Sequence, residues 1–170
     1  MKKLAVAGLV LAASLAAPAY AQMTGYVDIG AGQGKPKSDS DTDVSTSRQT
    51  VWAARVGARF TPNFALEAGY EDLGKYDFLV GGGSVKVSSW GVALVAIAPI
   101  EQFDIYGRLG YARTHQSADT QGFSATDNQN EAYYGVGGRY NWQNFGFFAE
   151  WNRHDKIKID YWLAGVQLRF

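Results

Sequence analysis

The chain has 170 residues, with 16 Lys and Arg against 16 Asp and Glu, and it contains no cysteine. The lack of cysteine excludes a disulfide scaffold and a Cys-ligated zinc site. Because the formal net charge is +0, the basic excess of a nucleic-acid binder is missing, and we expect no nucleic-acid partner. Aromatic residues make up 14% and there are 20 Gly, a mixture that favours twisted strands and tight turns over long helices.

The first 21 residues have the pattern of an export signal. Lys2 and Lys3 precede a short apolar run, which ends in Ala-Tyr-Ala at residues 19–21. A positive start, an apolar core and an Ala-x-Ala end predict a secretory signal peptide over residues 1–21, cleaved after Ala21. We therefore expect a mature chain of residues 22–170 that folds as one domain.

Apolar residues recur at every second position along eight segments of the mature chain, which is the period of a strand. The predicted strands are 24–32, 51–60, 64–72, 85–98, 103–114, 131–142, 145–153 and 159–170. Short connections alternate with long ones, and the long ones at 33–50, 73–84 and 115–130 are polar, so we expect solvated loops there. The longest uncharged apolar stretch, 90–100, is about half of the ~20 residues that a membrane-spanning helix needs.

One face of each predicted strand is apolar, and charges gather on the other. The polar face holds six acids and five arginines but no lysine, namely Asp28, Glu67, Glu71, Asp104, Glu131, Glu150, Arg55, Arg59, Arg108, Arg139 and Arg169. A soluble lipocalin-like barrel would bury the apolar face, whereas a membrane barrel turns it towards lipid. The presence of arginine and the absence of lysine on this face favour the membrane barrel. In a crowded interior the planar guanidinium group can form two hydrogen bonds to one carboxylate.

Aromatic side chains lie near the ends of the apolar stripes, as in the interfacial girdles of a membrane barrel. They are Trp52, Phe60, Phe64, Tyr70, Tyr111, Tyr140, Phe145, Trp151, Trp162 and Phe170. The sequence therefore predicts an all-β fold: an eight-stranded antiparallel up-and-down transmembrane β-barrel.

The interior of an eight-stranded barrel is just wide enough to be filled by side chains. Buried ions are costly unless they are paired, so we expect a salt-bridged plug in the lumen. In this hypothesis the arginines Arg55, Arg59, Arg108 and Arg139 pair with the acids Glu67, Glu71, Asp104, Glu131 and Glu150. Paired catalytic carboxylates are the alternative interpretation. The polar face also carries His154, for which we predict a hydrogen bond in the lumen rather than a metal.

The last strand alternates as Trp162-x-Ala164-x-Val166-x-Leu168-x-Phe170, which resembles the C-terminal assembly signature of bacterial outer-membrane proteins. In that signature Trp162, Val166, Leu168 and Phe170 are the residues that the barrel-assembly machinery would read. The segments FALEAGYEDLG (64–74) and FDIYGRLGYART (103–114) resemble the OmpA-like transmembrane domain family, a relative of the OmpX/Ail group.

This resemblance implies residence in the cell outer membrane of a Gram-negative bacterium, with outer-membrane lipid and lipopolysaccharide as neighbours. It also implies the barrel-assembly machinery and periplasmic chaperones as partners during biogenesis. Full-length OmpA-type proteins continue into a periplasmic peptidoglycan-binding domain, whereas this chain ends with the last predicted strand. Anchoring to the cell wall is therefore not expected.

The expected function is a structural or adhesion-like role at the surface, with a host or cell-surface ligand bound by the extracellular loops. The acidic run SDSDTD at 38–43 is similar to a calcium loop but lacks the required Gly and distal Glu, so we expect neither metal nor cofactor. A small-solute pore is the alternative within this fold.

A third interpretation is enzymatic. His115-Gln116-Ser117 resembles the His-x-Ser of PagL-type lipid A deacylases, which are also eight-stranded barrels. Positions i and i+2 of a strand share a face, so imidazole and hydroxyl could meet on the lipid side. The surrounding residues do not resemble that family and no orienting acid is evident, so we expect no enzyme.

Overall fold

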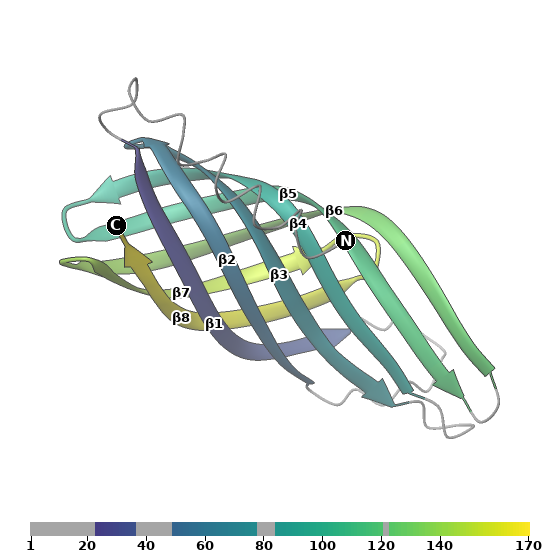
Figure 1. The fold of residues 1–170 in the computed structure, drawn as a ribbon. Coiled ribbons are helices and arrows are strands. Elements are labelled where there is room, and N and C mark those ends of the chain that lie inside the picture. The colour runs from purple at the N-terminus through teal and green to yellow at the C-terminus, as the bar shows by residue number, and fades with distance from the viewer. Residues whose placement is uncertain (1–22, 37–48, 78–83, 121–122) are drawn as a thin grey trace.

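The computed structural model describes residues 23–36, 49–77, 84–120 and 123–170 (Figure 1). The predicted signal peptide at 1–21 and the acidic run at 38–43 lie outside these ranges. Within them, no helix has the length and apolar character needed to cross a membrane.

The described residues form eight strands that close into one barrel. The strands are β1 (Thr24–Pro36), β2 (Gln49–Thr61), β3 (Phe64–Asp77), β4 (Ser84–Ile100), β5 (Phe103–Thr120), β6 (Phe123–Trp142), β7 (Phe145–His154) and β8 (Ile159–Arg169). Each strand pairs antiparallel with the next, and β1 pairs with β8. The predicted all-β, up-and-down barrel is confirmed.

The two ends of the barrel differ. At the end that holds the C-terminus, tight turns join the strands (Figure 1). Ile100 pairs with Phe103 and Trp142 with Phe145, which leaves two-residue turns there. Their first residues, Glu101 and Gln143, have φ of 53° and 52°, the left-handed conformation that tight hairpins require.

At the opposite end several strands run further than predicted. Residues 115–130 were expected to be a loop, but the pairing of β5 with β6 continues without a break to Thr120 and Phe123. Two polar segments can pair and extend a hairpin into water, because both faces of the extension are then solvated and polar side chains are favourable on each. Alternation of apolar and polar residues, the signal used to predict strands, does not report such an extension.

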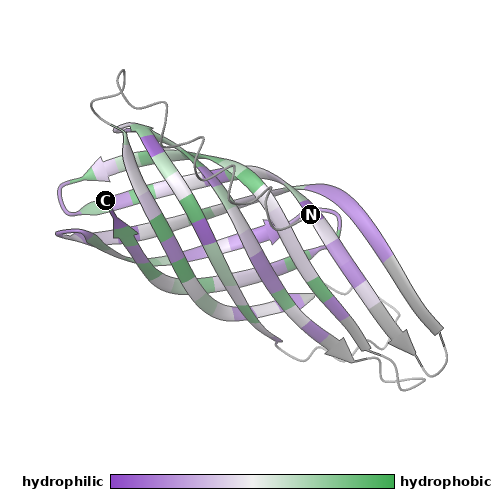
Figure 2. Cartoon of the chain, viewed as in Figure 1, coloured by the Kyte–Doolittle hydropathy of each residue, from purple (hydrophilic) through white to green (hydrophobic). Residues whose placement is uncertain are grey.

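The faces of the strands are arranged as predicted for a membrane barrel. Outward-facing Leu109 and Trp162 are each 65% exposed, whereas inward-facing Glu150 is 1% exposed. Apolar and polar residues alternate along most of the strands (Figure 2). The apolar surface therefore lies outside, and the charged side chains lie within the barrel.

The seam between β1 and β8 depends on a close approach of two backbones. A Cβ atom added to Gly32 would lie 1.6 Å from the carbonyl oxygen of Trp162. A backbone carbonyl cannot swing aside as a side chain does, so only glycine fits here without moving β8.

We predict that Gly32→Ala destabilises the barrel by roughly 1–3 kcal/mol or more, because the added methyl group pushes the seam apart. Gly138→Ala is the matched control, since a Cβ there meets nothing nearer than 4.0 Å. Urea unfolding in lipid vesicles, followed by the mobility shift on cold SDS gels, measures both. Equal stability of the two variants would contradict the close approach.

Candidate functional site

The centre of the lumen is occupied by one carboxylate with several donors. Glu150 on β7 lies 2.7 Å from Nη2 of Arg55 and 2.9 Å from Nη1 of Arg108. It also accepts hydrogen bonds of 2.8 Å from the hydroxyl of Tyr106 and from the amide of Asn152. All of these side chains are buried. Glu150 thus joins β2, β5 and β7 across the interior.

Two further glutamates extend this arrangement. Glu67 accepts hydrogen bonds from Nε of Arg108 at 2.7 Å and from the hydroxyl of Tyr26 at 2.8 Å. Glu71 accepts one from Nη2 of Arg55 at 2.8 Å. We call the five residues Arg55, Glu67, Glu71, Arg108 and Glu150 the central charge cluster. Its two cations lie among three anions, so charge-assisted bonds replace part of the water that the ions lose. Nε and Nη1 of Arg55 and Nη2 of Arg108 are buried without a hydrogen-bond partner among the described residues.

His154 supplies a further partner on the side of the long hairpins. Its Nε2 is 3.1 Å from Glu71, and its Nδ1 is 3.0 Å from Glu131. Glu131 also accepts hydrogen bonds from Thr114 and from the backbone N–H of Ile157. The expected arginine partner of Glu131 is thus replaced by the histidine. Glu131 lies near the middle of β6, and His154, the last residue of β7, pairs with Tyr133 two positions further along β6.

A looser set of charges lies at the end with the tight turns. Nη1 of Arg59 is 3.5 Å from Asp104, and Nη1 of Arg139 is 3.8 Å from the same carboxylate. The guanidinium of Arg139 also lies 4.9 Å from the ring centre of Tyr106, a cation–π contact. Arg169 donates to the carbonyl of Gln143 at 2.7 Å. The structure therefore places all nine residues of the expected lumen set inside the barrel.

Apolar side chains also line the lumen beside the charges, from Phe148 on β7 to Ile159, which pairs with His154. The sequence analysis did not predict them. Val51, Leu73, Val87, Ile159, Leu163, Phe148 and Tyr161 belong to one buried cluster, against which Ile157 packs. We call this group the apolar cap. A detectable signal was the run Val51-Trp52-Ala53, where both faces of the strand are apolar.

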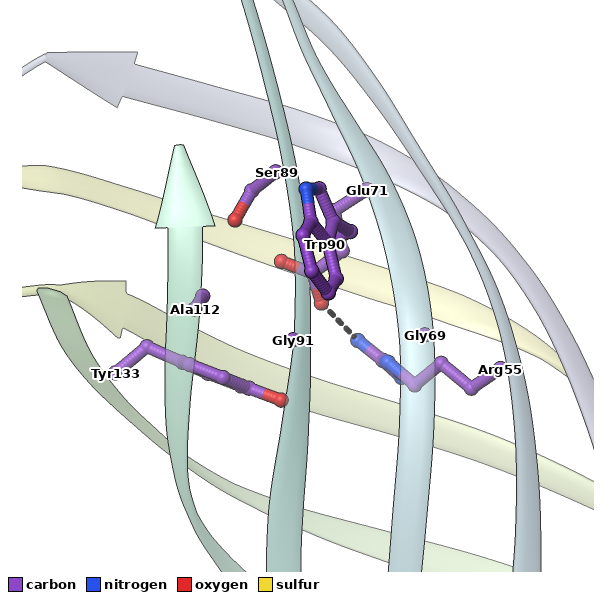
Figure 3. Close-up of a pocket in the computed structure, with 8 residues that line it drawn as sticks. All are labelled: Arg55, Gly69, Glu71, Ser89, Trp90, Gly91, Ala112 and Tyr133. Carbon is purple, nitrogen blue, oxygen red and sulfur yellow. Dashed lines mark hydrogen bonds and ion pairs between the residues drawn. The ribbon is translucent and has the colours of Figure 1, made fainter. Parts of the chain in front are cut away.

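One small pocket lies inside the barrel. A pocket between the central charge cluster and the wall of β3, β4 and β5 has a volume of about 10 Å³ (Figure 3). That is room for about one water molecule. Glycines on the inner face leave room for large rings: a Cβ on Gly57 would lie 2.3 Å from Tyr26, and one on Gly110 2.3 Å from Tyr133.

The remaining predicted residues lie on the outer wall. His115 is exposed on β5, and its Nδ1 contacts Oδ1 of Asn128 on β6. Ser117 is half-buried two positions further along. Among the hydrogen bonds of the described residues, none joins a serine hydroxyl to His115. Residues Trp162, Val166, Leu168 and Phe170 of the expected assembly signal all face outwards and are exposed.

A closed barrel with an apolar exterior and a filled, charged interior defines a transmembrane barrel of the outer-membrane type. The family model of the outer membrane protein beta-barrel domain matches residues 5–170, so the chain belongs to this family. The protein is therefore a β-barrel of the bacterial outer membrane. A search of curated proteins gave no match.

Solved structures of similar fold come from several bacteria. Ail, the attachment invasion locus protein of Yersinia pestis, is 20% identical with a TM-score of 0.64, over 86% of this chain and 98% of that chain. Neisserial surface protein A is 16% identical with a TM-score of 0.61, over 86% and 97%. OprG from Pseudomonas aeruginosa is 16% identical with a TM-score of 0.60, over 86% and 95%. These likenesses show the fold alone.

We predict that Glu150→Ala destabilises the barrel by about 3–5 kcal/mol, because it leaves two buried guanidinium groups without their shared carboxylate. Asp160→Ala is the control: its partner Arg153 is 3.6 Å away and both side chains are partly exposed, so a loss of at most about 1 kcal/mol is expected. The midpoint of urea unfolding measures both. Similar midpoints for the two variants would refute the central role of Glu150.

Proposed function

We propose that this protein is a non-catalytic surface-interaction barrel, adhesion-like in role. Its extracellular hairpins bind a host or cell-surface ligand, and its salt-bridged lumen is a structural plug. The observation that carries the proposal is the long β5–β6 hairpin. β5 has 18 residues and β6 has 20, against 10 in β7 and 11 in β8.

Two hydrogen bonds stabilise the polar base of this hairpin. It extends past the neighbouring β7 and β8 in Figure 1. Nζ of Lys156, from the turn between β7 and β8, donates to the carbonyl of Asn130 at 2.8 Å. Within β6, the amide of Gln129 donates to Asp127 at 2.9 Å. Binding residues commonly lie on such projections from a rigid scaffold.

The solved structure of one similar protein suggests a ligand to test. Ail was solved in complex with the heparin analogue sucrose octasulfate, in a structure 19% identical to this chain over 87% of its length with a TM-score of 0.64. Sulfated polysaccharide is therefore a reasonable first ligand to test for the extracellular hairpins of this protein.

We predict that replacing residues 116–127 by Asn-Gly abolishes the surface interaction, because His115 and Asn128 are opposite each other and can be joined by a two-residue turn. Bacteria carrying the variant should bind epithelial cells no better than bacteria without the protein. The control replaces Glu101 and Gln102 by Asn-Gly in a turn at the other end. Binding by the shortened variant at the wild-type level would refute the proposal.

A small-solute pore is less well supported. The pocket of about 10 Å³, the central charge cluster and the apolar cap leave little room for a solute to pass. We predict that the purified barrel gives no discrete conductance steps in planar bilayers. Steps from the wild type that grow in Glu150→Ala would instead favour conduction through the lumen.

The lipid A hydrolase remains the enzymatic alternative, with His115 as base and Ser117 as nucleophile. Asn128 could orient His115, but the missing hydrogen bond from a serine speaks against an assembled nucleophile. Loss of an acyl chain from lipid A, detected by mass spectrometry, would favour it. For biogenesis, we propose that Trp162, Val166, Leu168 and Phe170 are read by the barrel-assembly machinery after delivery by periplasmic chaperones.

A further inference from the structure

His154 is a fully buried histidine whose two ring nitrogens both face carboxylates. Its exposed fraction is 0%. Nδ1 lies 3.0 Å from Oε1 of Glu131, and Nε2 lies 3.1 Å from Oε2 of Glu71. A neutral imidazole carries a proton on only one nitrogen, so it can donate to only one of these carboxylates. The other nitrogen would then be an acceptor opposite an acceptor, which is costly inside a barrel.

The neighbouring hydroxyl groups do not supply the second proton. The hydroxyl of Tyr161 is 3.4 Å from Nε2, but it has one proton, which it donates to Glu71. On the other side of the ring, Thr114 donates its hydroxyl proton to Oε1 of Glu131, the oxygen that also faces Nδ1. The contacts are therefore satisfied when both ring nitrogens of His154 carry a proton.

The charges in the lumen also favour an imidazolium. The polar face holds six acids and five arginines, so a protonated His154 is the sixth cation. The ring of Tyr133 stacks on the histidine with centroids 5.2 Å apart, and the negative face of an aromatic ring attracts a cation. The charged and titratable groups around the histidine are Arg55 on β2, Glu71 on β3, Arg108 on β5, Glu131 and Tyr133 on β6, Glu150 on β7, Tyr161 on β8, and the exposed Asp155 and Lys156 in the next turn.

Glu131 connects the histidine to the turn between β7 and β8. Its Oε2 accepts the backbone N–H of Ile157 at 3.3 Å. The side chain of Ile157 packs against the apolar cap, and the N–H of Asp155 donates to the carbonyl of Ala132 at 3.3 Å. The carboxylate that His154 holds in place thus holds this turn against the inside of the barrel.

We infer that His154 is a buried proton-binding site, and that its imidazolium holds the β7–β8 turn to the lumen through Glu131. When the proton is lost in alkaline medium, one ring nitrogen becomes an acceptor opposite a carboxylate, so Glu71 or Glu131 moves away. Because the folded barrel binds this proton more tightly than the unfolded chain does, the stabilisation is present at pH 6 and is lost as the pH rises. The site does not depend on the ligand proposed for the hairpins.

Nitrogen-15 NMR of the wild-type barrel, labelled at histidine and held in detergent micelles, tests the protonation directly. The chain has two histidines, and the variant His115→Gln assigns their signals. Both ring nitrogens of His154 should carry a directly bonded proton at pH 8, where a free histidine side chain, with a pKa of ~6.5, is mostly neutral. An unprotonated Nδ1 or Nε2 at pH 8, with the proton on Glu131 instead or absent, would overturn the inference.

The same sample, raised in pH until His154 loses its proton, tests the link to the turn. The protection of the Ile157 amide against hydrogen exchange should then fall about tenfold or more, because its acceptor is released. The amide of Arg169, which donates to the carbonyl of Asn144 at the other end of the barrel, is the control and should keep its protection. An unchanged Ile157 amide, or an equal loss at Arg169, would contradict the link.

A variant tests the contribution to stability. His154→Gln should lower the urea midpoint of unfolding by about 1–2 M at pH 6, because it leaves two buried carboxylates without their shared cation. The deficit should shrink at the pH where the wild-type histidine loses its proton. His115→Gln, on the outer wall, is the matched control and should shift the midpoint at neither pH. A deficit for His154→Gln that stays constant with pH would show that the proton has no part in it.

Discussion

The need to fill a narrow lumen shapes this protein more than any other constraint. Eight strands closed into a barrel satisfy every backbone hydrogen bond, but they enclose a space that must hold either water or side chains. Here side chains fill it, and many of them are charged. Glu150 is central, because it accepts from donors on β2, β5 and β7 and lets two arginines be buried side by side.

The same constraint explains the glycines and the outer surface. Glycine recurs on the inner face where Tyr26 or Tyr133 occupies the lumen. The residues between these inward-facing positions point outwards, towards lipid. Exposed leucine, valine and aromatic residues occupy them. Stability is thus built into the barrel, and we propose that recognition is left to the hairpins.

Much of the fold could be predicted because period-two alternation and the chemistry of each face are local properties. Arg55 and Glu71, for example, could be assigned to the lumen without knowing which strands meet there. Their partners could not, since they depend on the stagger of the strands around the barrel. Glu131 illustrates this: only the register shows that His154 is beside it.

Two features of the structure could not be predicted from the alternation of apolar and polar residues. The β5–β6 hairpin continues with polar residues on both faces, so its sequence looks like a loop. The apolar cap uses Val51 and Val87 on a face otherwise read as polar. The hairpin extension, Val51 and Val87 lie towards the end opposite the tight turns, where the demand for one lipid-facing and one polar face ends.

The arrangement of the two faces can be tested on the unmodified protein, because four of the five tryptophans, Trp52, Trp90, Trp142 and Trp162, are exposed on the outer wall. Tryptophan fluorescence would be measured in bilayers of lipids brominated at different depths along the acyl chain. We predict strong quenching through lipid contact with the apolar face, greatest for bromines near the headgroups. Fluorescence unaffected by brominated lipid at every depth would mean that the apolar face points inwards, and would contradict it.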